Sequence, residues 1–525
     1  MEFYCVLNRP MIPMTPSAPT DSPNHLTSHH HDTLLTLHQN WTPTKKYATY
    51  LTICVFAFLT MLNSSNFTLA IIPVAHDLHT TTARAGYLTS LQVLAMGLGN
   101  LFWVPLMRIT GKRPAYLVSL LFLILTNIWG YFSSTYTSLL VSRLIGGFAV
   151  ATADAPVPGV VADLFFFHER GHCMMMFHTA ISTGVFLGPL INGYIVQYAG
   201  WRWMMGFTAI AASATFLVGI FTIHESAYAR EKVDGNLSAL EYPPERSWRE
   251  ELSLTLGYDR DASFGKWVWS TLAILGYPPV LIVGLTIGVC VGWWVGYLSI
   301  LSHQIPSRAI PNTISLSRNI SVQLTSTLTF SAPPYHWSAH QLGLLSISGF
   351  VGAVISFFIG GRLIDILATR LTAHKGGSPE PEYRLPGMIF PALVGPMGVL
   401  TFGLVVANHK HWMGAAVGYA MLGFGLNAAS NVVVTYAVDA YRPIASEVIT
   451  IVFITRNVMA CIFSLYISSW LEAQGTARAF GEMVGIQYVI FALSAVLYFF
   501  GKGIREWTGT FGPMKEAGLR WREIR

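Results

Sequence analysis

Twelve predominantly apolar segments of about 20 residues restrict the fold of this chain more than any other feature of its sequence. A run of this length spans the hydrocarbon of a bilayer as a helix, and irregular backbone cannot face lipid because its polar groups would lack partners. We therefore expect an all-α polytopic membrane protein with twelve transmembrane helices. The segments lie near residues 48–75, 86–106, 115–133, 138–165, 173–198, 203–223, 276–302, 341–367, 387–407, 411–438, 445–470 and 485–503.

The charge and cysteine content exclude several other classes of protein. Only 11% of the residues are Asp, Glu, Lys or Arg, against roughly 25% in soluble domains. The net charge of +6 lies in short clusters between apolar segments, so it sets membrane topology and does not indicate nucleic-acid binding. The five cysteines show no metal-ligand spacing, and no Walker sequence is present. We expect no enzyme activity, metal or cofactor.

A charged stretch divides the segments into two groups of six, and the N-terminal stretch is polar and rich in Pro, Ser, Thr and His. If both termini are cytosolic, the short inner loops with Lys45 and Lys46 carry eleven basic residues and the outer loops six, the bias of the positive-inside rule. Asn319 then lies in an Asn-Ile-Ser sequon of the longest outer loop, a possible glycosylation site. The expected parts are a tail 1–46, a half 47–223, a linker 224–267, a half 268–503 and a tail 504–525.

Two loop motifs occupy equivalent places in the two halves. Residues 104–114 read Val-Pro-Leu-Met-Arg-Ile-Thr-Gly-Lys-Arg-Pro, and residues 361–365, Gly-Arg-Leu-Ile-Asp, are followed by Arg370. Both resemble the cytosolic loop motif of the major facilitator superfamily. The resemblance implies two six-helix repeats that rock around a central site, with gating roles for Arg108, Arg113, Asp365 and Arg370.

Other stretches narrow the resemblance. The fourth segment carries Arg143, Gly146 and Gly147, similar to the superfamily's pattern there. The fifth segment resembles the motif of its proton-driven antiporters, which implies a packing seal at Gly184, Gly188, Pro189 and Gly193. Residues 163–171, 200–203, 333–335, 381–385 and 439–443 are similar to fungal drug:proton antiporters and polyamine-transporter relatives. This group implies a monomer in the plasma membrane that binds protons and a small molecule.

Arg108 departs from the family pattern, because an acidic residue normally occupies its position. In the family that acid holds the two halves together through the cytosolic end of the eleventh helix, where this chain has Glu447. One hypothesis is therefore a swapped ion pair between Arg108 and Glu447. The alternative is a solvated basic loop without a specific partner.

Charged residues within the apolar segments are candidates for function, because an ionised side chain in hydrocarbon is unstable without a partner or cavity. Arg143 and Asp154 are eleven residues apart, on nearly one face of a regular helix. Asp154 is our first candidate for the proton or substrate-cation site, with a structural role as the alternative. Pro156 and Pro158 should interrupt the helix beyond it, which would either free carbonyls toward a cavity or only kink the helix. Arg456 needs an anionic or carbonyl partner.

Amides and aromatic residues supply further candidates for the central site. Asn63 and Asn66 lie in the first segment, and Asn427 and Asn431 share nearly one face of the tenth. Each alone is better explained by interhelical hydrogen bonding than by contact with a ligand. Trp294 in the seventh segment, with Trp293 and Tyr297, could stack on a flat or cationic substrate, although such residues often anchor a helix at the interface.

The sequence thus predicts a proton-coupled secondary transporter. Export of small amphipathic or cationic organic compounds is the first hypothesis. Uptake or exchange of a polyamine-like nutrient cation is the second, and Asp154 suits both. A membrane sensor that binds a ligand without moving it is a third, suggested by the altered residue at Arg108. Substrate identity and the direction of transport are not readable from the sequence.

Overall fold

The computed structural model describes residues 41–68, 70–165, 167–225, 263–300, 339–374, 380–408 and 411–516, and residues from Pro43 onward form one compact unit. The described residues contain helices and no strands. The helices are α2 (Pro43–Ser64), α3 (Ile71–Asp77), α4 (Thr82–Thr110), α5 (Lys112–Tyr131), α6 (Tyr136–Val150), α7 (Pro156–Leu164), α8 (Phe167–Ala199), α9 (Arg202–Thr222), α11 (Phe264–Ala273), α12 (Pro278–Ile300), α14 (Ala339–His374), α15 (Ile389–Ala407), α16 (Trp412–Ala440), α17 (Ala445–Gln474), α18 (Thr476–Thr508) and α19 (Gly512–Glu516).

Helices suited to a membrane dominate the architecture. Ten in the described residues are long and apolar enough to cross a bilayer, and the bent pair α11 and α12 makes eleven if counted as one span. A shorter apolar stretch, Leu344–Gly360, lies within α14. Large apolar side chains such as Leu125, Phe499 and Phe500 are exposed on the outside of the bundle, as expected where lipid is the solvent. The predicted fold class is confirmed.

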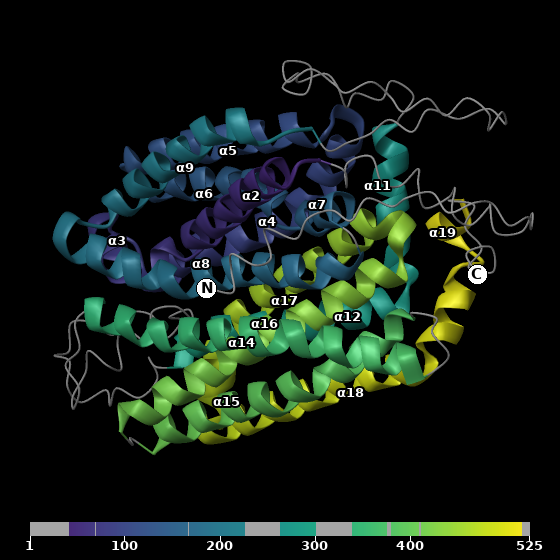
Figure 1. The fold of residues 1–525 in the computed structure, drawn as a ribbon. Helices are drawn as coiled ribbons and strands as arrows, with labels where there is room; N and C mark the ends of the chain where they lie inside the picture. The colour runs from purple at the N-terminus through teal and green to yellow at the C-terminus, as the bar shows by residue number, and fades with distance from the viewer. Residues whose placement is uncertain are drawn as a thin grey trace, which may run out of the picture. The chain divides into compact units, whose positions relative to one another are not determined.

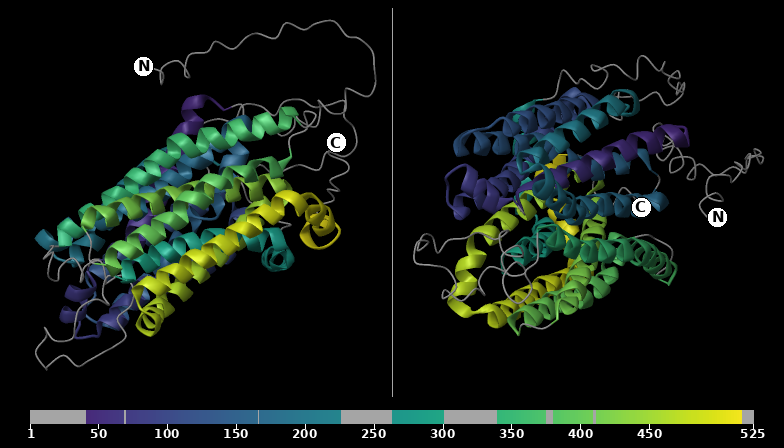
Figure 2. Two further views of the ribbon diagram at one scale, coloured as in Figure 1. Left: turned by 90° about the horizontal axis from the view of Figure 1, so that it is seen from below. Right: turned by 90° about the vertical axis from the view of Figure 1, so that its left-hand side faces the viewer.

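The helices form two groups within this unit. Helices α2 to α9, purple to blue in Figure 1, lie together, and α12 to α18, teal to yellow, lie together (Figures 1 and 2). Across the division α8 packs against α14, and α4 packs against α17. We call the end of the bundle at which α2 begins and α9 ends the linker end, because residues 225 and 263, both within the expected linker 224–267, adjoin α9 and α11 there.

The first apolar segment is not one continuous helix, which corrects the range 48–75. Helix α2 ends at Ser64, a 3-10 turn spans Asn66–Thr68, and α3 begins at Ile71. Ser64 Oγ donates to Thr60 O at 3.0 Å and Ser65 Oγ donates to Leu62 O at 2.9 Å. Such side-chain bonds to preceding carbonyls compete with the helical ladder, so the polar run in this segment ends the helix.

The fourth segment is interrupted, as its prolines predicted. Helix α6 ends at Val150, a 3-10 turn spans Ala151–Ala153, and Pro156 lies in the first turn of α7, where a missing N–H does no harm. Pro156 and Pro158 leave the carbonyls of Thr152 and Asp154 without a helical donor, and an orientation of these two carbonyls toward a cavity stays a prediction. At the end of α6, Trp103 Nε1 donates to Phe148 O at 2.8 Å and Ser119 Oγ donates to Ala149 O at 2.6 Å, so side chains of α4 and α5 bind two carbonyls there.

Several helices are longer than the apolar segments that predicted them. Helix α18 begins nine residues before the predicted start at 485, and α14 continues to His374 beyond 367. The extensions carry polar residues, and in α18 Arg478 pairs with Glu482 one turn later at 3.3 Å, a spacing that stabilises exposed helix. The expected C-terminal tail from 504 begins with the last turn of α18 and with α19. The proposed domain boundaries remain a prediction.

The helix-five glycines bring α8 close to α2. A Cβ on Gly184 would lie 2.5 Å from Phe58 O and 2.7 Å from Met61 Cβ, and one on Gly188 would collide with Ser65. Real Cβ atoms do not approach so closely, so the two helices pack at a distance that only glycine permits. The packing role expected for this stripe is confirmed, while its function as a seal remains a prediction.

We expect Gly184→Leu to destabilise the folded protein by about 1–3 kcal/mol, because the new side chain must displace α2 backbone. Thermal unfolding of the purified protein in detergent would measure this. Gly485→Leu in α18 is the matched control, since a Cβ there meets nothing within 4 Å. Equal midpoints for the two variants would contradict the close α2–α8 contact.

Candidate functional site

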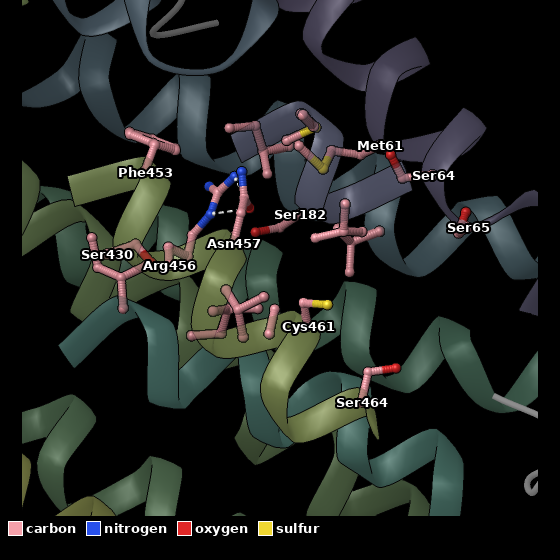
Figure 3. A pocket seen from close by; sticks show the side chains of 18 of the residues that line it. Met61, Ser64, Ser65, Ser182, Ser430, Phe453, Arg456, Asn457, Cys461 and Ser464 are labelled. Atoms are coloured by element: carbon pink, nitrogen blue, oxygen red, sulfur yellow. Dashed lines mark hydrogen bonds between the residues drawn. The ribbon is translucent and has the colours of Figure 1, made fainter. Parts of the chain in front are cut away.

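A central pocket lies between the two groups of helices. Residues of α2, α4 and α8 line it on one side and residues of α12, α16 and α17 on the other, and Figure 3 shows it from close by. Its wall combines apolar side chains with a set of polar ones: Ser64, Ser65, Thr89, Ser90, His178, Ser182, Asn427, Ser430, Arg456, Asn457 and Ser464. A mostly apolar concave surface with a few polar groups is the usual form of a small-molecule site.

An ion pair between the two groups of helices borders this pocket. Arg456 Nη2 of α17 donates to Asp154 Oδ2 at 2.5 Å, and Asp154 lies at the break between α6 and α7. Asp154 is 0% exposed and Arg456 6%, so each needs the other to remain ionised away from water. Of the two kinds of partner expected for Arg456, an anion or a carbonyl, the structure shows an anion. Asp154 itself is not among the pocket-lining residues.

Neighbouring side chains hold the guanidinium in place. Arg456 Nε and Nη2 both donate to Asn457 Oδ1 at 3.1 Å, and the guanidinium carbon lies 4.2 Å from the centroid of the Phe453 ring. Figure 3 shows Arg456 and Asn457 hydrogen-bonded at the pocket wall. The two hydrogen bonds to Asn457 and the contact with the Phe453 ring keep the planar guanidinium in one orientation. In this orientation Arg456 lines the pocket and also contacts Asp154.

Arg143 belongs to a separate buried polar network within the first half. It donates to Asn63 Oδ1 at 3.0 Å and to Asn63 O at 2.6 Å, and also to the Gln92 side chain. Asn66 Nδ2 donates to Asn63 Oδ1 at 3.3 Å, and Asn192 Nδ2 donates to Asn66 Oδ1 at 3.0 Å. None of these five residues lines the pocket.

The interruption of helix four explains this separation from Asp154. The shared helix face of Arg143 and Asp154 assumed a regular helix, and the backbone between α6 and α7 is not regular. Asn63 O is free to accept from Arg143 because α2 ends there. Arg143, Asn63 and Asn66 therefore connect helices of one half, and a substrate-binding role for them stays a prediction.

Asn427 connects the two halves next to the pocket. Its amide donates to Ala353 O at 3.1 Å and to Thr179 Oγ1 at 3.3 Å, and it accepts from Ser182 Oγ at 3.2 Å. Thr179 and Ser182 are on α8, whereas Asn427 is on α16. Asn431 is buried one turn later, accepts from Thr435 Oγ1 at 3.5 Å, and is not among the lining residues.

The hypothesis of a swapped pair at the linker end agrees with the geometry. Arg108 Nη2 at the end of α4 lies 3.2 Å from Glu447 Oε1 at the start of α17, and Glu447 is buried. The Arg108 guanidinium carbon also lies 5.5 Å from the Trp267 ring centroid on α11. The pair joins the two halves at the linker end, and a second contact between α4 and α17 lies at the pocket wall, where the hydroxyls of Ser90 and Ser464 are 2.6 Å apart. Its role in gating stays a prediction.

Sequence reasoning did not pair several charges at the linker end. Arg384 Nε lies 2.8 Å from Asp439 Oδ2, Arg505 Nη2 lies 3.2 Å from Glu382 Oε1, and Lys502 Nζ lies 2.6 Å from Glu380 Oε1. Lys112 also pairs with Asp163. Residues 381–385 and 439–443 stood out as motifs, so the signal for the first pair was present. His178, which lines the pocket, was also missed.

The remaining predicted residues lie elsewhere. Arg113 Nη2 donates to Ile220 O at 2.8 Å, while its backbone N–H and that of Lys112 donate to the Glu225 carboxylate at 3.0 Å. Arg370 is exposed on α14. Pro189 lies within α8, as does Gly193. Asp365 and Trp294 are on α14 and α12 with side chains outside the described part of the chain, and Asn319 lies outside the described residues.

Comparison with known proteins identifies the family. Residues 53–464 match the family model described as the Major Facilitator Superfamily. The chain belongs to this superfamily. The fold agrees: the xylose transporter XylE from E. coli has a TM-score of 0.55 at 12% identity, covering 86% of this chain and 98% of that one. The human organic anion transporter MFSD10 has a TM-score of 0.54 at 14% identity, with 86% and 100% covered.

Curated fungal relatives are similar over most of this facilitator-superfamily chain. The transporter cpaT of Aspergillus oryzae is 28% identical, covering 89% of each chain. The efflux pump radE of Floropilus chiversii is 25% identical, covering 89% of this chain and 82% of its own. The citrinin biosynthesis cluster transporter mrr1 of Monascus ruber is 26% identical, covering 86% of each. The protein is thus a multi-pass membrane transporter of this superfamily that is similar to fungal transporters, among them an efflux pump.

We expect Arg108→Glu to reduce transport roughly tenfold, because it places two carboxylates against each other where one is buried. Adding Glu447→Arg should restore most of the flux measured in proteoliposomes. Arg84→Glu at the other end of α4 is the control, since Arg84 is exposed and an acid suits a helix N-terminus. A double variant as slow as Arg108→Glu would show that the pair is not a gating contact.

Proposed function

We propose that this chain is a proton-coupled secondary transporter that exports small amphipathic organic compounds. The observation that carries the proposal is the Asp154–Arg456 ion pair, which joins the two halves beside the central pocket. Asp154 is the residue that takes up and releases the proton, and Arg456 is its partner in the opposite half. We further propose a monomer in the plasma membrane with both termini in the cytosol.

The position of the pair supports proton coupling. A carboxyl group that is protonated loses its charge and its attraction for a guanidinium. Because Asp154 belongs to the first half and Arg456 to the second, proton binding would weaken a contact between the halves in this conformation. A ligand that changes the relative stability of two conformations shifts the population between them. Proton uptake at Asp154 would therefore be linked to the movement of the halves.

The nature of the pocket and the relatives support the transport of amphipathic compounds. The pocket wall contains Met61, Val93, Ile287, Phe453 and other apolar side chains beside its hydroxyls and amides. The printed name of radE is an efflux pump, and mrr1 is named as the transporter of a biosynthesis cluster. Export of organic molecules made by the cell is the activity that fits both observations.

The geometry gives less support to the alternatives that need a cationic ligand. A polyamine-like nutrient or a cationic drug requires an acidic group in the site, and the described pocket wall contains no carboxylate. Asp154 would first have to be released by Arg456. A sensor that binds without transport differs from a carrier in one measurable respect, since it shows saturable binding and no flux.

We expect Asp154→Asn to abolish the dependence of flux on an imposed pH gradient, because the amide side chain does not take up and release a proton as a carboxylate does. The assay uses proteoliposomes with defined inner and outer pH and a panel of amphipathic aromatic acids, amides and amines. Exchange of unlabelled for labelled compound at equal pH should persist in the variant, since the pocket wall is intact.

Asp77→Asn is the control, because Asp77 is a carboxylate outside the spanning helices that interacts with Trp201 and Arg202. Hydrogen bonds from these two side chains hold the pKa of Asp77 below its usual value. Gradient-driven flux should survive in this variant. A native response to the pH gradient in Asp154→Asn would remove Asp154 from the account, and an absence of any flux in the native protein would overturn transport of this panel.

A further inference from the structure

The ionisable side chains in the described wall of the central pocket are basic. Among the described residues that line it, Arg456 and His178 are those that carry or can take a positive charge, and neither Asp nor Glu is present. Asp154 contacts Arg456 from behind the wall. A bound amine would place its charge next to Arg456 without a carboxylate in the wall, an unfavourable arrangement at low dielectric. The pocket wall is therefore suited to a different class of ligand.

Arg456 has donor capacity left over. Its Nε and Nη2 atoms donate to Asn457 and Asp154, while Nη1 donates to no residue in the described part of the chain. A guanidinium has five N–H donors in a rigid fork, and Arg456 lines the pocket. The unused edge can therefore donate to a ligand while the other nitrogens keep their partners.

His178 supplies a second unused group from the other half. It lies on α8, is 4% exposed, and lines the pocket. Its ring makes no hydrogen bond to any described residue, and Nε2 is buried without a partner. Buried polar atoms in folded proteins almost always have a partner, and a neutral imidazole has one N–H to donate. A ligand with an acceptor group in the pocket would satisfy this atom.

We propose that the transported molecule is an amphipathic organic acid whose ionised carboxylate, enolate or phenolate binds between Arg456 and His178. This inference rests on the proposed function and names the substrate class for the same pocket. The acid group accepts from Arg456 of the second half and His178 of the first, and the apolar part packs against side chains such as Val185, Ile287 and Phe453. Hydrogen bonds from a guanidinium to an ionised acceptor are stronger than hydrogen bonds between neutral groups.

The proposal also determines the sign of the coupling between proton and substrate. Asp154 and the acid group contact the same guanidinium, so an ionised Asp154 repels a second anion there and protonation of Asp154 removes this repulsion. Each binding event then favours the other by the same factor. The acid and the proton leave together, and accumulation of the acid inside the cell drives its export. This differs from the exchange suggested by the glycine pattern of α8.

The experiment measures binding of matched probes to the purified protein in lipid nanodiscs. One set is naphthylacetic acid, naphthylacetamide and naphthylethylamine, and a second is decanoic acid, decanamide and decylamine. We expect each acid to bind at least about tenfold more tightly than its amide, the difference typical of a charge-assisted hydrogen bond. Acid binding in weakly buffered solution should take up protons, and Asp154→Asn should abolish this uptake.

Variants at His178 separate recognition from folding. His178→Leu removes the N–H donor at similar volume and should weaken acid binding roughly tenfold and amide binding by much less, because a neutral carbonyl accepts a weaker hydrogen bond than an ionised acid. His178→Gln retains a donor and should keep most of the acid affinity. Thermal unfolding checks that both variants are folded. Equal losses for acid and amide in His178→Leu would mean a structural role only and would overturn the proposal.

The outcomes also distinguish this inference from the proposed function. Tighter binding of the amines or amides, or export of amines and neutral compounds alone in the flux panel, would overturn the acid site and leave transport standing. Acid binding without flux of any compound would overturn transport and leave the acid site standing. If no acid binds and none is exported, the acid site is wrong.

Discussion

The burial of opposite charges on opposite halves is the constraint on which the centre of this protein depends. Asp154 has its carboxylate where α6 and α7 separate, and Arg456 extends from the middle of α17. Neither half contains the counter-ion for its own charge, and an unpaired buried charge is strongly destabilising. The ion pair therefore holds the two halves together at this level. The pocket lies beside this point and shares one of its residues.

The break in helix four shows how this arrangement is compatible with lipid. Two backbone carbonyls at the end of α6 accept hydrogen bonds from the side chains of Trp103 and Ser119. These two carbonyls therefore have partners without water. The break occurs in a fully buried part of the bundle, which is where membrane proteins tolerate such backbone. An uninterrupted helix would keep Asp154 in a regular turn. The interruption instead places its carboxylate against a helix of the other half.

Much of the fold was predictable from the sequence because the bilayer imposes one length scale and one type of secondary structure. The apolar segments, the need of Arg456 for an anionic or carbonyl partner and the hypothesis of a pair between Arg108 and Glu447 all followed from that physics or from a family pattern. The expected site fared differently. Asn63 and Asn66 face Arg143 and not the pocket, because the polar run that nominated them also ends α2. Hydropathy does not record which face of a helix meets its neighbour.

His178 illustrates the other limit of sequence reasoning. A histidine in an apolar segment usually finds a hydrogen-bond partner, so its residue type alone gave no reason to select it. Its significance depends on the absence of a partner among the described residues and on its place in the pocket wall. Both facts arise from packing between α8 and helices of the second half. Similarly, Arg384 and Asp439 belong to separate motifs and meet only because η5, a 3-10 turn at Pro381–Met388, packs on α16.

The reversed polarity of the Arg108–Glu447 contact has a consequence for the evolution of the chain. The two residues belong to different halves, so neither can change sign alone without setting like charges together where one is buried. The halves must therefore have diverged as a matched set. A hybrid that joins this first half to a second half with a basic residue at the position of Glu447 would face two cations at the linker end, and its halves would separate there more readily than those of either parent.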